Sequence, residues 1–295
     1  MSRAKSRSGV PAREQRVGTR NARFQQWRAL LDNRTKRHQA GEFLVHGVRP
    51  ITLAVDHGWP LRALLRPADT PLSSWATDLI ARVTAGRSGS AGTQVVDVAA
   101  ELLHELGDKA DGAPELIAVA AMPPDGLDRI VVPPDGLVLL FDRPANPGNI
   151  GTLVRSADAF GVCGVVVTGH AADVYDPRAV RASTGSLFAV PVVRQGSPRD
   201  VLSWIAELRS AAGIPLQVVG TDESGEVDVD GTDLTGPRLL VVGNELRGMS
   251  ATWREACDVV VRIPIVGAAS SLNASVAAGI VCYEAQRQRR SGTPG

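Results

Sequence analysis

The sequence predicts two consecutive α/β domains. Short apolar, β-branched runs alternate with amphipathic helical segments along most of the 295 residues, as expected of α/β proteins. The segment 124–136 is rich in proline and glycine and is the predicted linker between the domains. Hydrophobic residues make up 44% of the chain, enough for a sizeable core. No apolar run approaches the roughly 18 residues of a membrane helix, so we expect a soluble cytoplasmic protein without a membrane partner.

Positive charge gathers at the N-terminal end. Residues 1–49 hold twelve Lys and Arg against three Asp and Glu, although the whole chain has a net charge of only +1. Arginine binds phosphate through paired hydrogen bonds, and Phe24 and Trp27 lie among these arginines, where aromatic rings can stack on unpaired bases. We predict that residues 1–40 form a basic, partly flexible arm that contacts RNA. A solvated tail is the alternative.

The first domain is predicted over residues 41–123. Its strand-like runs are 43–45, 61–65, 93–98 and 115–122, and its helical runs are 48–56, 73–86 and 99–107. Gly86 and Gly107 act as stop signals for the second and third of these helices. The alternation indicates a compact α/β unit of about a hundred residues.

The second domain is predicted over residues 137–295. Continuous apolar runs without polar alternation are typical of strands buried on both faces, and they occur at 137–142, 164–169, 216–221, 238–245 and 259–265. One helix begins after the cap Ser197 and ends before Gly213. The last helix, predicted over 271–290, carries four apolar residues on one face: Leu272, Val276, Ile280 and Tyr283.

Three segments of the second domain stand where predicted strands end, which is where open α/β sheets bind ligands. They read NPGNIGTLVRSADAFG (146–161), GNELRGMS (243–250) and IPIVGAASSLNASVAAGI (263–280). The glycine spacing of the first fits neither the dinucleotide-binding fingerprint nor the P-loop. Taken singly, Arg155 is explained as an ion-pair partner, Glu245 as a surface acid and Ser271 as a helix cap. Their occurrence together favours a common site.

These three segments, in this order, resemble the motifs of the SpoU (TrmH-like) branch of the SPOUT methyltransferases. The likeness covers residues 137–289. The stretch GEFLVHGVRPITLAVDHGW, from residue 41, resembles the L30e-like substrate-binding domain of the same family, although His46-Gly47 stands where many relatives have Glu-Gly. The resemblance implies a deep trefoil knot in the second domain. It also implies a homodimer in which Arg155 can act across the interface.

The resemblance implies S-adenosylmethionine as the cofactor, held mostly by backbone groups in the knot. The implied cofactor-binding residues are Gly220, Thr221, Gly243, Asn244, Ile263, Leu272 and Ala274. The three cysteines and five histidines show no CxxC or HxxH spacing, so we expect neither a disulfide framework nor a metal.

The implied reaction is methylation of a ribose 2′-hydroxyl in ribosomal RNA. The segment ADVYDPRAVRASTGSLFAVPVV (172–193) is most similar to the avilamycin-resistance subgroup, which acts on a uridine of 23S rRNA. The implied catalytic residues are Arg155, Asn146, Glu245, Ser271 and Asn273. Because a guanidinium keeps its proton, we favour Arg155 as a donor to the 3′-phosphate or the developing oxyanion. Asn146 and Asn273 would position the ribose, and Glu245 would orient Arg155 or an asparagine.

Three further arginines are candidates for RNA contact. Arg178 and Arg181 lie on the first turns of a helix that Asp176 and Pro177 begin, and Arg49 follows the turn after His46. Ordinary surface charge explains each of them equally well. Two other functions stay open on the sequence alone: a transfer-RNA 2′-O-methyltransferase, and a non-catalytic protein that binds rRNA or assists ribosome assembly.

Overall fold

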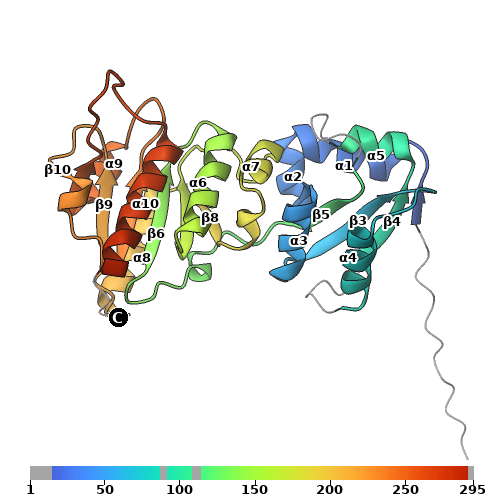
Figure 1. Cartoon of the computed structure of the whole chain (residues 1–295), viewed down its shortest axis with the longest axis horizontal. Coiled ribbons are helices and arrows are strands. Elements are labelled where there is room, and N and C mark those ends of the chain that lie inside the picture. Colours follow the sequence, from blue (N-terminus) through green and yellow to red (C-terminus); the bar gives the residue numbers. More distant parts are fainter. Residues whose placement is uncertain (1–14, 87–91, 108–113, 292–295) are drawn as a thin grey trace, which may run out of the picture.

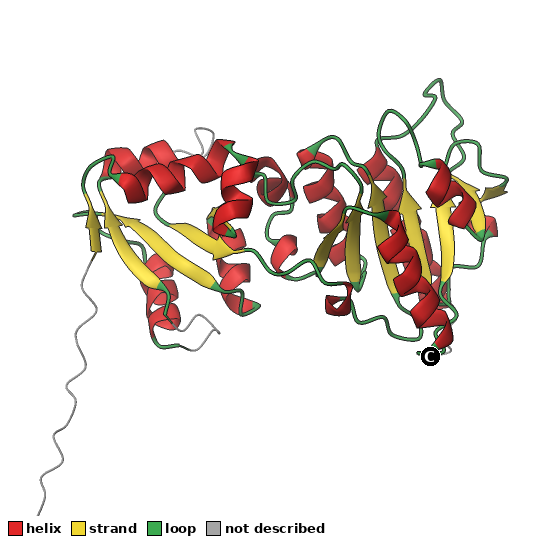
Figure 2. Ribbon diagram, turned by 180° about the vertical axis from the view of Figure 1, so that it is seen from behind, coloured by secondary structure: helices red, strands yellow, loops and turns green. Residues whose placement is uncertain are grey.

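The protein consists of two α/β domains placed side by side along its long axis (Figure 1). The computed structural model describes residues 15–86, 92–107 and 114–291. The first domain is built on a five-stranded sheet and the second on a seven-stranded sheet. Figure 2 shows both sheets from behind, with helices on both of their faces. The predicted division into two α/β units is confirmed.

The first domain has a mixed sheet. Its strand order is β1 (Gln15–Val17), β4 (Gln94–Val98), β3 (Leu61–Pro67), β5 (Ile117–Ala121) and β2 (Glu42–His46). β5 runs antiparallel to both of its neighbours, and the other pairs are parallel. The helices are α1 (Ala22–Asp32), α2 (Arg34–Ala40), α3 (Val48–Asp56), α4 (Ser74–Thr84) and α5 (Ala100–Leu106). α1 and α5 pack on one face of the sheet, and α3 and α4 pack on the other.

The described part of the predicted arm belongs to the first domain. β1 pairs with β4, and Asn21 and Asn33 cap α1 and α2. Phe24 is 0% exposed and Trp27 is 5% exposed, because both pack with Leu30 against the sheet. The prediction that these two rings stack on RNA bases is therefore wrong, and so is a domain boundary at residue 41. Residues 1–14 lie outside the described part of the chain.

The second domain has a fully parallel sheet. Its strand order is β10 (Val227–Asp228), β12 (Val259–Arg262), β9 (Gln217–Thr221), β11 (Arg238–Val242), β6 (Leu137–Asp142), β7 (Gly164–Thr168) and β8 (Val192–Gln195). Its helices are α6 (Pro147–Ala159), α7 (Pro177–Ala182), α8 (Pro198–Ser210), α9 (Ala251–Ala256) and α10 (Ala274–Ser291). Single 3-10 turns lie at η1 (Leu127–Arg129), η2 (Ser186–Phe188) and η3 (Val229–Gly231).

Alternate side chains of β6 bury themselves on opposite faces, as the pleat of a strand requires. Leu139 and Phe141 join the cluster that contains α6 and α10, whereas Val138 and Leu140 join the cluster beneath α8. Both faces are covered, which explains why these strands read as unbroken apolar runs. α6 and α10 lie in front of this sheet in Figure 1.

The final helix is held against the connection between β9 and β11. The Gln288 side chain donates to Thr232 O at 2.9 Å and accepts from Leu234 N at 2.8 Å. Arg289 donates to Leu234 O at 3.3 Å and to Gly236 O at 3.0 Å. These contacts anchor the C-terminal end of α10 beside residues 232–236. The trefoil knot itself stays a prediction from the resemblance.

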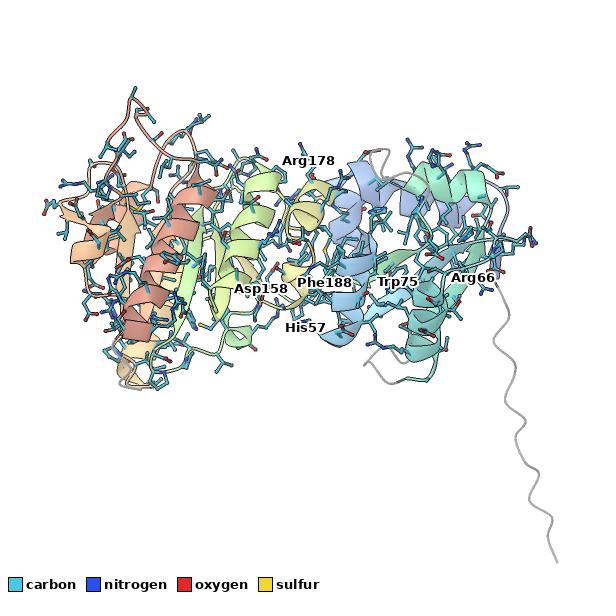
Figure 3. The ribbon with its side chains drawn as sticks, in the orientation of Figure 1. His57, Arg66, Trp75, Asp158, Arg178 and Phe188 are labelled. Atoms are coloured by element: carbon cyan, nitrogen blue, oxygen red, sulfur yellow. The ribbon has the colours of Figure 1, made fainter. Side chains whose placement is uncertain are left out.

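A buried ion pair and an aromatic cluster join the two domains. Arg37 Nε donates to Asp173 Oδ2 at 2.8 Å, and the two side chains are only 2% and 3% exposed. Below this pair, Phe43 of β2 lies 4.7 Å from the Tyr175 ring and 6.3 Å from the Phe188 ring, between ring centroids. Figure 3 shows Phe188 between the domains. One hydrophobic cluster therefore runs through both domains.

Replacing Arg37 with Met should lower the free energy of unfolding by about 3 kcal/mol, because Asp173 would keep a buried charge without its main partner. Urea denaturation at neutral pH measures this loss. Arg62→Met is the matched control, because the Arg62 side chain is 62% exposed and its ion pair with Glu42 is long, at 3.9 Å between Nε and Oε1. Its loss should stay below about 1 kcal/mol. Equal losses in the two variants would contradict a stabilising role of the buried pair.

Candidate active site

A cavity of about 530 Å³ opens at the C-terminal ends of β9, β11 and β12. Six of the seven predicted cofactor-binding residues line it: Thr221, Gly243, Asn244, Ile263, Leu272 and Ala274. Gly220 is the exception. It lies inside β9, where a Cβ would come within 2.8 Å of Met249 Cε and 2.7 Å of Cys257 Sγ. Gly220 therefore makes room for packing beneath the cavity, and its role in cofactor binding stays a prediction.

The loop 243–250 forms one wall of this cavity. Asn244 and Gly248 exchange two backbone hydrogen bonds of 3.0 Å, and the Asn244 side chain accepts the N–H groups of Leu246 and Arg247. Gly248 has a φ of +63°, a conformation that favours glycine. A Cβ on Gly243 would collide with the backbone of Gly248 and Met249. The two glycines thus permit a tight, self-bonded loop.

The Glu245 carboxylate connects this loop to the start of α6. It accepts hydrogen bonds from Ala145 N at 3.0 Å, Asn146 N at 3.3 Å and Asn149 Nδ2 at 2.9 Å. Asn149 Oδ1 in turn accepts a bond of 3.1 Å from Asn273 Nδ2. The expectation that Glu245 orients an asparagine agrees with this geometry. All three predicted segments meet in this chain of contacts.

The asparagine in this chain is Asn149 rather than the predicted Asn146. The Asn146 side chain is the N-cap of α6 and accepts from Gly148 N at 2.8 Å. The order Asn-Pro is the usual pattern of an N-cap followed by proline at the first helical position. Had this rule been applied to the sequence, it would have given Asn146 a structural role. Asn149 would then have been the amide available for the site.

Asn273 is oriented from both sides. Its Oδ1 accepts from Ser275 N at 2.9 Å and from Val276 N at 3.4 Å, at the start of α10. The Nδ2 group is therefore left to face Asn149. Ser271 lies two residues earlier on the cavity wall and is exposed.

Arg155 is exposed on α6 and makes no hydrogen bond or ion pair with any residue that the structure describes. It does not contact Glu245, whose orienting partners are Ala145, Asn146 and Asn149. A guanidinium left open to solvent can donate to an arriving phosphate or oxyanion. Its role stays a proposal.

The other arginines gather near the junction of the domains. Arg178 is 70% exposed and pairs with Asp176, and Figure 3 shows it on the upper edge of the molecule. Arg181 and Arg49 are also exposed. Their segments are neighbours, because a Cβ on Gly185 would lie 3.2 Å from the Cα of Pro50. The arrangement is compatible with RNA contact at all three positions, which remains a proposal.

Two regions of the chain match described families. Residues 21–118 match the SpoU L30e-like domain, and residues 136–283 match the SpoU rRNA Methylase family. The chain belongs to the SpoU rRNA methylase family. Its first domain is the L30e-like domain and its second is the SpoU methylase domain. The first match begins at Asn21, the N-cap of α1, in agreement with the early start of that domain in the structure.

Close relatives have both domains. The chain is 55% identical over 289 residues to a 23S rRNA (uridine(2479)-2′-O)-methyltransferase of Streptomyces viridochromogenes, covering 98% of each chain. The crystal structure of the SpoU methyltransferase AviRb from that organism, in complex with AdoMet, is 56% identical with a TM-score of 0.86 and covers 93% of this chain and 100% of that one. An AdoMet-bound rRNA methyltransferase from Sinorhizobium meliloti is 28% identical with a TM-score of 0.79, over 92% and 97%.

The described residues of this SpoU methylase also bear on metal binding and on membrane insertion. Among them, no group of three or more His, Cys, Asp or Glu side chains is arranged to hold a metal ion. None of the described helices is both long and apolar enough to cross a membrane.

Hydrogen bonds to the Glu245 carboxylate lower its pKa. Burial by itself would raise this pKa, but the donated N–H groups of Ala145, Asn149 and Asn146 outweigh burial and hold it below its ordinary value of 4.5. Because the pKa is lower in the folded protein, the ionised carboxylate stabilises the fold above the unfolded pKa. That contribution is lost as the pH falls through the folded pKa.

Glu245→Gln should therefore be less stable than the parent protein by an amount that is constant above about pH 5 and shrinks as the pH falls below the ordinary glutamate pKa. Urea denaturation between pH 3 and pH 7 measures the difference. Glu223→Gln is the matched control, because Glu223 lines the same cavity but is exposed. A Glu245→Gln difference that grows on acidification would contradict the lowered pKa.

Proposed function

We propose that this protein transfers a methyl group from S-adenosylmethionine to the 2′-hydroxyl of a uridine ribose in 23S rRNA, in the cytoplasm. The observation that carries the proposal is the Glu245–Asn149–Asn273 chain at the rim of a ligand-sized cavity. The activity of the Streptomyces viridochromogenes relative, which matches this chain over 98% of its length, supports the same reaction.

The residues of the cavity suit S-adenosylmethionine. Val242, Val261 and Ile263 supply apolar walls for an aromatic base. Glu223 is an exposed carboxylate on the wall that can pair with a cationic ligand group, whereas Asp222 is already paired with Arg254. Arg247 on the wall can pair with a ligand carboxylate. Residues 243–248 form part of the same wall. When bound there, the cofactor supplies an electrophilic methyl group that needs no metal.

The protein side of the mechanism is positioning and charge stabilisation. The amides of Asn149 and Asn273 are fixed by Glu245 and by the start of α10, so they can orient a ribose without reorganising. Arg155 keeps its proton and acts as a donor to the 3′-phosphate or to the oxygen that becomes negative. The proton of the 2′-hydroxyl then leaves to solvent or to a phosphate oxygen rather than to Arg155.

We further propose a homodimer formed through α6 and α10. Two residues of the apolar face that the sequence places on the last helix are exposed on α10 in the single chain: Val276 49% and Tyr283 50%. Leu272, which the sequence also placed on that face, precedes α10 and lines the cavity. Tyr283 packs edge-on against Phe160, next to the end of α6. A surface of this kind rarely stays in water. A second copy that covers it would lie close to Arg155, which agrees with a role for that residue across the interface.

Arg155→Ala should lower methyl transfer at least about a hundredfold, because it removes stabilisation made only in the transition state. Binding of S-adenosylmethionine should stay within about twofold of the parent protein, since Arg155 does not line the cavity. Tritium transfer to ribosomal RNA and isothermal titration measure the two quantities. Arg199→Ala is the control and should change neither, because Arg199 is an exposed residue in the first turn of α8. Parallel losses of binding and transfer would show that Arg155 is structural.

Tyr283→Asp should convert a dimer into monomers, because a charge would be placed in the buried apolar contact. Sedimentation velocity measures the mass. Val131→Asp serves as the control, since Val131 is 78% exposed and belongs to the linker rather than to α6 or α10. A parent protein that sediments as a monomer, or a variant that remains a dimer, would overturn the proposed interface.

Methyl transfer to 23S rRNA, 16S rRNA and tRNA distinguishes the proposed substrate from its alternatives. We expect transfer to 23S rRNA only, and mass spectrometry of nucleosides from the product should show 2′-O-methyluridine. Transfer to tRNA alone would favour the tRNA enzyme. Binding to rRNA without any affinity for S-adenosylmethionine would favour the non-catalytic protein. We also propose that the methylation confers resistance to avilamycin-type antibiotics. A host that expresses the parent enzyme should then survive a higher concentration of such an antibiotic than a host that expresses Arg155→Ala.

A further inference from the structure

Arg143 lies between the end of β6, which leads into α6, and the loop 243–250. It directly follows β6 and has a φ of +52°, a left-handed conformation that non-glycine residues rarely adopt. Within the described ranges, only Asp69 and Thr184 share this feature among non-glycine residues. Left-handed backbone at a functional loop is often retained because the side chain is needed there.

The side chain of Arg143 bridges two fixed points. Its Nε and Nη2 groups donate to Asp142 Oδ2 at 3.1 and 3.0 Å, and Nη2 also donates to Gly248 O at 3.2 Å. Asp142 is only 1% exposed and accepts a further bond of 2.8 Å from Ser250 N. The guanidinium therefore ties the end of the 243–250 loop to the end of β6.

The backbone of Arg143 holds the other end of the same loop. Its carbonyl accepts a bond of 2.6 Å from Asn244 Nδ2, and its N–H donates to Thr168 O at 2.9 Å. Asn244 and Gly248 both line the cavity, and Glu245 between them carries the contact to Asn149. A change at Arg143 would therefore alter the cavity wall at Asn244 and Gly248. Through Glu245 it would also alter the position of the Asn149 amide.

We propose that Arg143 is a positioning residue that holds the 244–248 loop in the shape that binds S-adenosylmethionine. The inference rests on the proposed function for the identity of the ligand, but not for the ordering of the loop. Arg143 does not touch the cavity itself. Its effect passes through the Gly248 carbonyl, the Asn244 amide and the buried Asp142 carboxylate.

Arg143→Gly separates this role from a purely structural one. Glycine accepts a φ of +52° without backbone strain, and Asp142 keeps the N–H of Ser250 as a partner. The buried Asp142 carboxylate loses its ion pair, so the melting temperature should fall, but the variant should remain folded at 25 °C. Loss of the bond to Gly248 should nevertheless weaken S-adenosylmethionine binding by about tenfold, as expected for a charge-assisted hydrogen bond. The turnover number at saturating cofactor should change less than the KM for the cofactor.

Asp69→Gly is the matched control, because Asp69 has a φ of +58° and an exposed ion pair in the other domain. It should leave cofactor affinity within twofold of the parent protein. Arg143→Lys keeps one donor and should give an intermediate affinity. Unchanged affinity in Arg143→Gly would overturn the proposal, and so would an equal loss in Asp69→Gly.

Hydrogen exchange without any ligand provides the readout that is independent of the proposed function. The amides of Asn244 to Ser250 should exchange at least about fivefold faster in Arg143→Gly and at the parent rate in Asp69→Gly. A parent protein that fails to bind S-adenosylmethionine would refute the proposed function alone. Unchanged exchange in this loop would refute the positioning role alone.

Discussion

The candidate active site depends on one carboxylate. Glu245 projects from the loop after β11 and accepts N–H groups of Ala145, Asn146 and Asn149, where α6 begins. A helix N-terminus leaves such donors unpaired, and its dipole favours negative charge. This contact sets the direction of Asn149, and Asn149 accepts the Asn273 amide. One acidic side chain therefore holds three loops that are up to 128 residues apart in sequence in a single arrangement.

The parallel sheet makes this contact possible. β6 and β11 are neighbours in register, with Leu137 opposite Arg238 and Phe141 opposite Val242, so the loops that follow them leave the same edge side by side. Asp142 and Arg143 occupy the space between these loops and satisfy their inward-facing N–H and C=O groups. The cavity is left at the next strands along, β9 and β12. Binding and catalytic groups thus share one rigid edge.

The L30e-like domain is joined to this edge by packing as well as by the linker. Arg37 of α2 pairs with Asp173, just before α7, and α7 packs on the helix that carries Arg155. The aromatic cluster around Phe43 extends the same contact. A displacement of the first domain would have to separate a buried charge pair and apolar rings, both of which oppose it. The arginines of the two domains near the junction are therefore held in a fixed arrangement, and we propose that they form one RNA-binding surface.

The sequence by itself determined the two α/β units, nine of the twelve described strands, the three motifs and the family, because strand burial and loop glycines leave local patterns. It missed the short strands β1, β8 and β10. The sequence wrongly indicated that Phe24 and Trp27 bind RNA, because aromatic residues among arginines have the same sequence pattern whether their rings are buried or exposed. Only the tertiary structure paired Glu245 with Asn149, placed Gly220 beneath the cavity and revealed Arg143. Those decisions rest on contacts between residues distant in sequence, which no local pattern records.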